Sequence, residues 1–233
     1  MNRTRAIVTA ALLAASGFFG ARWATSAHPE RVDRSAESTL LAVPPARGAI
    51  VTDGELDEHA WQGPLARTGP LRAKDGSPAR PHSEARLLWG DGMLYVALYA
   101  ADRDIVTNDT GRGEPRWMGD SFHFTLTVRD ATYVFEVSPS GALTEARVAG
   151  ASTDYGWKSG AKVGHDVDGT VDDPTDDDEE WAIEMAIPLS SLGARPEQGE
   201  RLGFSVRRCD VGHDTRRQCA SWGETERAAI VLQ

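Results

Sequence analysis

The chain has 233 residues, of which 40% are hydrophobic and 26% are charged, and its formal net charge is −10 at pH 7. This composition is ordinary for a globular protein, and the length allows one large domain or two small ones. The excess of negative charge argues against nucleic acid or an anionic membrane as a partner, because both require a positive surface.

The first residues predict a secretory signal peptide over residues 1–27. Arg3 and Arg5 precede the apolar run Ala6–Ala15, and the small residues Ala24–Ala27 supply a cleavage site. An uncleaved anchor is the alternative, but the run is short for a bilayer span. We therefore expect a secreted or periplasmic protein that leaves the membrane after cleavage.

Residues 28–46 are mixed and polar and predict a linker, and residues 47–233 show no repeat and no second core, so we expect them to form one domain. A short strand is expected at Ala49–Thr52. A helical turn is expected at Leu56–Trp61, with Asp57 as its N-cap. The Gly- and Pro-rich residues 62–84 predict a loop.

The stretch Ala85–Ile105 predicts two strands joined by a tight turn at Gly90-Asp91-Gly92. Nine consecutive apolar residues, Met93–Ala101, make the second strand apolar on both faces. Such a strand is covered on both sides, so this hairpin is expected at the centre of the fold.

Several shorter apolar stretches follow, and clean alternation is clearest in Ser121–Val128, where Phe122 and Phe124 point inward and His123 outward. Further strands are expected at 133–137, 142–148, 181–187, 202–209 and 228–232, with a helical turn at 189–192. Many short strands with almost no helix predict an all-β fold, an antiparallel β-sandwich of the jelly-roll or immunoglobulin-like kind.

The segment Asp53-Gly-Glu-Leu-Asp-Glu-His-Ala-Trp61 resembles an Asp-Gly-x-Leu-Asp-Glu-x-x-Trp signature of the family 9 carbohydrate-binding modules and their DOMON-like relatives. Trp117-x-x-Asp-Ser121, Phe135–Gly141 and Trp181-x-x-Glu-x-x-Ile-Pro188 follow in the family's order. The resemblance covers about residue 47 to the C-terminus. It implies a non-catalytic module that binds a polysaccharide or oligosaccharide of the cellulose or xylan type in support of carbohydrate catabolism. Since such modules usually accompany glycoside hydrolases, it also implies a secreted glycosidase as partner.

The resemblance also implies a ligand site at Trp117, Trp222 and His123. In sugar-binding members two tryptophans sandwich a terminal sugar ring, whose C–H faces pack on an indole. Trp117 matches the first of them, and Trp222 is similar to the second. His123 stands where those members carry a Glu, and a neutral His bonds a hydroxyl without acting as a charged acceptor. The alternative is that both tryptophans are core plugs in loops.

Asp102, Asp104 and Asp120 flank the strand ends around the Trp117 loop. Carboxylates gathered from two loop ends suit Ca²⁺, which takes six to eight oxygen ligands, and the resembled family often carries calcium. The alternative is local turn chemistry, in which Asp side chains cap turns. Calcium would serve a structural role.

Cys209 and Cys219 are the only cysteines, and in an exported chain a close pair predicts a disulfide. Two cysteines alone make a poor zinc site.

Other function classes find less support. Glu136 and Glu184 lie on predicted strands, but no cleft or catalytic constellation accompanies them, so we do not expect an enzyme. A calcium-stabilised structural or partner-binding surface module is the main alternative. A haem-binding electron-transfer domain is a further one, for which Met93, Met118 and His123 supply the ligand types.

Overall fold

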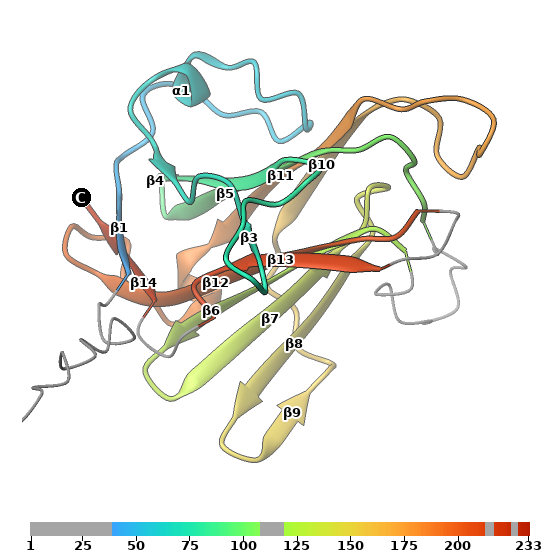
Figure 1. The fold of residues 1–233 in the computed structure, drawn as a ribbon. Coiled ribbons are helices and arrows are strands. Elements are labelled where there is room, and N and C mark those ends of the chain that lie inside the picture. Colours follow the sequence, from blue (N-terminus) through green and yellow to red (C-terminus); the bar gives the residue numbers. More distant parts are fainter. Residues whose placement is uncertain (1–38, 108–118, 213–216, 225–227) are drawn as a thin grey trace, which may run out of the picture. The chain divides into compact units, whose positions relative to one another are not determined.

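The computed structural model describes residues 39–107, 119–212, 217–224 and 228–233 (Figure 1). The predicted signal peptide, Trp117 and Met118 lie outside these residues. Within the described ranges, no helix is long and apolar enough to cross a membrane.

The chain forms a β-sandwich of two sheets, as predicted, which we call the larger and the smaller sheet (Figure 1). The larger sheet runs in the order β1 (Leu40–Val43), β14 (Ala229–Leu232), β12 (Arg201–Asp210), β6 (Ser121–Val128), β7 (Ala131–Val137), β8 (Leu143–Ala149) and β9 (Ser152–Asp154). Two more strands extend it beside β12, namely β13 (Gln218–Trp222) and then β3 (Arg72–Ala73).

The smaller sheet runs in the order β10 (Lys162–Asp168), β11 (Glu180–Pro188), β5 (Met93–Ala101), β4 (Ser83–Gly90) and β2 (Ala66–Arg67). One α-helix, α1 (His59–Gln62), and a 3-10 turn, η3 (Leu189–Leu192), complete the described elements. Apart from the parallel pair of β1 and β14, the described strands pair antiparallel.

The core between the sheets follows from the alternation of apolar residues. On β6, Phe122, Phe124 and Leu126 are fully buried, and the ring of Phe124 stacks on that of Phe135 with centroids 4.7 Å apart. From the smaller sheet, β5 and β11 contribute apolar side chains that include Val96 and Ile183. Burial of these side chains is the main favourable contribution to folding.

A second, smaller cluster covers the other face of β5, which explains why that strand is apolar on both sides. Trp61 and Leu56, from α1 and the segment before it, pack there against Leu88, Ala97 and Ala182. The segment that carries the opening signature therefore acts as a lid over the outer face of the smaller sheet.

Residues 62–84, predicted as a loop, contain β2 and β3 and the first residues of β4. Between residues 40 and 61 the structure differs from the prediction in three further ways. Leu40–Val43, placed in the predicted linker, forms β1 beside β14. Ala49–Thr52 is not a regular strand. Glu58, and not Asp57, precedes the helix, and its side chain makes no capping hydrogen bond to the helix. A four-residue helix held down by Trp61 gains its stability from packing, so a cap contributes little.

Glu184 connects this segment to the smaller sheet. Its carboxylate is fully buried and accepts a hydrogen bond from Trp61 Nε1 at 2.8 Å and from the backbone N–H groups of Asp53 and Gly54 at 3.2 and 3.3 Å. Gly54 has φ +105°, and a Cβ there would lie 2.3 Å from the backbone of His165. The Asp-Gly pair, the Trp and the Glu of the sequence motifs thus form one hydrogen-bonded unit.

We expect Glu184→Gln to lower the free energy of unfolding by about 1–3 kcal/mol, because one amide NH₂ would face an N–H donor that the carboxylate now satisfies. Denaturant unfolding measures the difference. The control is Glu179→Gln, an exposed acid just before β11, which should change the value by less than about 0.5 kcal/mol. Equal stabilities of the two variants would contradict the assigned role of Glu184.

Candidate functional site

A row of polar side chains crosses the outer face of the larger sheet. His123 of β6 pairs with Arg207 of β12, Arg207 pairs with Ser221 of β13, and Ser221 pairs with Arg72 of β3. Directly paired residues point to the same face of a sheet. Because the neighbouring Phe122 and Phe124 point into the core, the row faces solvent.

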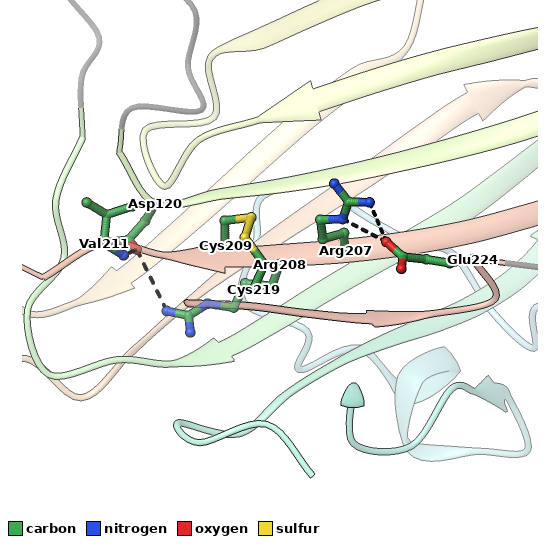
Figure 2. Close-up of a disulfide and its surroundings, with 7 residues drawn as sticks. All are labelled: Asp120, Arg207, Arg208, Cys209, Val211, Cys219 and Glu224. Atoms are coloured by element: carbon green, nitrogen blue, oxygen red, sulfur yellow. Dashed lines mark hydrogen bonds and ion pairs between the residues drawn. A yellow bond between two sulfur atoms is a disulfide. The ribbon is translucent and has the colours of Figure 1, made fainter. Parts of the chain in front are cut away.

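Around His123 lies an open pocket of about 290 Å³, lined by His123, Ser205, Val206, Arg207 and Glu224. Arg207 Nε donates to Glu224 Oε1 at 2.8 Å, and the two side chains also form an ion pair (Figure 2). The Arg207 hydrogen bond lowers the pKa of Glu224, so this carboxylate stays ionised at neutral pH.

The surroundings of His123 favour the neutral imidazole. Burial lowers its pKa below the ordinary value, and the charge of Arg207 acts in the same direction. A neutral imidazole has one N–H donor and one nitrogen acceptor. The pocket therefore offers donors and acceptors of the kind that hold hydroxyl groups.

A larger open groove of about 780 Å³ adjoins this pocket and shares Arg207 and Glu224 with it. We call it the basic groove. Its lining consists of Arg72, Ala73, Lys74, Arg207, Arg217, Cys219, Ala220, Ser221 and Glu224. No sequence motif pointed to these cations. The alternation of Val206, Arg207 and Arg208 was the available signal for Arg207, since it sets Arg207 on the face opposite to its buried neighbours.

Trp222 lies at the end of β13, paired with Val206 on the core side of the sheet. Its half-buried ring lies 5.8 Å from that of Phe204. One side of the indole thus packs on the core, while His123 belongs to the outer row. Trp117, the other predicted aromatic, is outside the described residues.

The remaining aromatic and haem candidates are spread over the molecule. Trp157 packs on Tyr133 with ring centroids 4.8 Å apart, whereas Tyr155 is 73% exposed. Met93 begins β5 of the smaller sheet, and His123 lies on the larger one.

Among the described residues, two groups of three carboxylates have ligand atoms within 4.8 Å of one another and could hold a metal ion. One contains two of the predicted residues, Asp102 and Asp120, together with Asp210. Asp104 is not part of this group, although its backbone N–H donates to Asp102 Oδ1 at 3.1 Å. The second group is Asp53, Glu58 and Glu184.

A buried guanidinium lies within the Asp102 group. Arg208, whose side chain is 3% exposed, places Nη2 2.6 Å from Asp102 Oδ2 and 3.4 Å from Asp210 Oδ1. The same nitrogen lies 3.9 Å from Asp120 Oδ1, the ion pair that Figure 2 shows. Burial raises the pKa values of Asp120 and Asp210, while the Arg208 charge opposes the shift. The cluster therefore already contains a cation.

Protein donors also occupy the carboxylate oxygens of this group. Asp120 accepts backbone hydrogen bonds from Val106 at 2.8 Å and Val211 at 2.9 Å, and Asp102 accepts one from Trp181 Nε1 at 3.1 Å. Calcium requires six to eight oxygens. An ion bound at this cluster would compete with the guanidinium and with these donors for the carboxylate oxygens.

The family profile described as "Carbohydrate family 9 binding domain-like" matches residues 51–229. The chain belongs to this family. This confirms the resemblance read from the sequence motifs. A search of the curated proteins found no match.

Solved structures share the fold of this family 9-like module. One is a candidate carbohydrate-binding protein from Bacteroides uniformis, at 17% identity and TM-score 0.58, covering 84% of this chain and 100% of the other. A family 9 carbohydrate-binding module from Caldicellulosiruptor kristjanssonii in complex with cellotriose has 17% identity and TM-score 0.56, covering 84% and 94%. A module of that family from the same organism in complex with glucose has 18% identity and TM-score 0.54, covering 82% and 95%.

The module contains the predicted disulfide. Cys209 of β12 and Cys219 of β13 are directly paired across the two strands and are joined by an S–S bond, with Cα atoms 4.2 Å apart (Figure 2). The bond ties the strand that carries Ser221 and Trp222 to the centre of the larger sheet. Disulfides persist in oxidising compartments, which agrees with an extracellular location.

We expect thiol titration of the purified, denatured and unreduced protein to find no free thiol. Replacing Cys209 and Cys219 together by Ala should lower the free energy of unfolding by about 2–3 kcal/mol, because the cross-link no longer restricts a short loop in the unfolded chain. Thermal unfolding of parent and variant, each treated with and without reductant, provides the control. A parent protein that is indifferent to reductant would contradict the prediction.

Proposed function

We propose that this module binds carbohydrate without catalysis and that the sugar lies on the outer face of the larger sheet, beside His123. The observation that carries the proposal is the family match over residues 51–229. The solved family 9 modules of the same fold, in complex with cellotriose and glucose, support it.

The chemistry of the pocket supports the same proposal. His123, Ser205 and Glu224 line it and offer both donors and acceptors for sugar hydroxyls. Trp222 is half-buried at the end of the neighbouring strand β13, and Trp117 would supply a further aromatic surface. Indole rings pack on the C–H faces of a pyranose, while fixed polar groups select its hydroxyls.

The ligand that we propose is a glycan of the cellulose or xylan type, and the process is carbohydrate catabolism. We propose that residues 1–27 direct export, so that the module acts outside the cytoplasm together with a secreted glycosidase. The disulfide between Cys209 and Cys219 supports export.

A second proposal concerns the calcium expected from the sequence. We propose that Arg208 takes the place of a metal ion at Asp102 and Asp120, so that this site requires no calcium. The ion pair of 2.6 Å with Asp102, buried on both sides, carries this proposal. A calcium-stabilised structural or partner-binding surface module is the competing function.

If Arg208 is the counter-ion, chelation should leave the melting temperature of the parent protein unchanged. Arg208→Gln should lower the free energy of unfolding by about 3–5 kcal/mol, because buried carboxylates lose their partner. Arg207→Gln is the matched control, since it removes an exposed ion pair worth at most about 1 kcal/mol. A lower melting temperature of the parent after chelation would instead favour the calcium-dependent module.

For the sugar site, we expect His123→Ala and Trp117→Ala to weaken binding of cellotriose or xylotetraose by about 1–3 kcal/mol each, the range for a buried contact. Trp222→Ala should weaken binding and also destabilise the fold, because its ring packs on Phe204. Titration calorimetry on variants shown to be folded measures the effect. Tyr155→Ala is the control and should bind like the parent. Unchanged binding by folded His123→Ala and Trp117→Ala proteins would move the site elsewhere.

A further inference from the structure

We propose that the basic groove makes this module selective for an acidic glycan, one that carries carboxylates as uronic-acid branches on a xylan-type chain do. The inference rests on the proposed carbohydrate function and names the ligand class of the same site. It comes from the excess of positive charge among the described residues that line the groove.

The groove collects positive charge on a chain whose net charge is −10. Arg72, Lys74, Arg207 and Arg217 line it, and Glu224 is the one carboxylate among its described lining residues. Glu224 is paired with Arg207 through a hydrogen bond of 2.8 Å. Cations therefore outnumber carboxylates among the described residues of the groove, whereas carboxylates outnumber cations in the chain as a whole. This local excess of positive charge favours an anionic ligand.

The cations are arranged along the sheet. Arg72 and Arg207 flank Ser221 on the adjacent strands β3, β13 and β12. Since neighbouring strands lie about 4.8 Å apart, the two arginine positions are separated by about 10 Å. A guanidinium binds a carboxylate through two parallel N–H donors, and the Ser221 hydroxyl between them suits a sugar hydroxyl.

Arg72 is partly held in place. Its Nη1 donates to the backbone carbonyl of Gly76 at 2.9 Å, within the hairpin that also carries Lys74. This bond uses one of the five guanidinium donors, so the side chain is oriented while most of its donors can serve a ligand. An oriented arginine loses less conformational entropy when it binds.

The groove continues the His123 pocket, because Arg207 and Glu224 line both. A glycan whose backbone sugar contacts His123 would therefore extend toward Arg72 and Lys74. At physiological salt the Debye length is about 8 Å, so distant acidic groups of the chain are screened while cations in contact with the ligand still act.

The test compares two ligands that differ by one charge, xylotetraose and xylotetraose with a single glucuronate branch. By titration calorimetry at low salt, the parent should bind the acidic ligand about tenfold more tightly, and added salt should reduce this ratio. Arg72→Gln and Lys74→Gln should each reduce the ratio about two- to fivefold, the effect of losing one exposed ion pair. Lys162→Gln removes an exposed lysine from β10 of the smaller sheet and should leave the ratio unchanged.

The possible results separate the two proposals. Equal affinity for both ligands would overturn the acidic preference and leave carbohydrate binding standing. Binding of neither ligand, nor of cellotriose, would overturn the proposed function and the inference with it. If polyglutamate bound as tightly as the acidic sugar, the groove would be a general anion site, and selectivity for a glycan would be refuted.

Discussion

The ion pair between Arg208 and Asp102 joins the two sheets at one end of the sandwich. Arg208 belongs to β12 of the larger sheet, and Asp102 directly follows β5 of the smaller one. Because side chains alternate along a strand, holding Arg208 inside fixes Arg207 on the outer face. The polar row from His123 to Arg72 therefore depends on a contact buried on the opposite side of the same strand.

The molecule satisfies its buried carboxylates in two different ways. Glu184 receives only neutral N–H donors, from Trp61 and the backbone of Asp53 and Gly54. Asp102 receives a full positive charge from Arg208. A carboxylate taken out of water must find partners or be protonated. Because these partners lie on other segments of the chain, both arrangements hold a loop against a strand. Glu184 and Asp102 thus both hold the fold together.

The strands that could be predicted are those with regular alternation, such as β6 and β11, where apolar residues repeat at every second position. The predicted strand at Ala49–Thr52 failed because its residues are held by the lid over β5 and not by a neighbouring strand. β13 was missed because its five residues, Gln218–Trp222, are too few and show no regular alternation of apolar residues. At the site, sequence reasoning placed His123 outward and Asp102 near Asp120. It could not find Arg208, because a charged residue in a strand is normally assigned to the surface.

The pairing of β1 with β14 has a consequence for how the protein folds. Leu40–Val43 and Ala229–Leu232 come from opposite ends of the described chain, and their pairing completes one side of the larger sheet. This contact cannot form before β14 has been synthesised, and β14 comes after all the other described strands. Pairing such distant segments requires a long loop to close, and the entropy of that loop is lost before the new contacts are gained. Folding that depends on such a contact is therefore slow. Until β14 is made, the Arg201–Gly203 end of β12 therefore lacks its neighbour on that side, and β1 lacks the described strand with which it pairs.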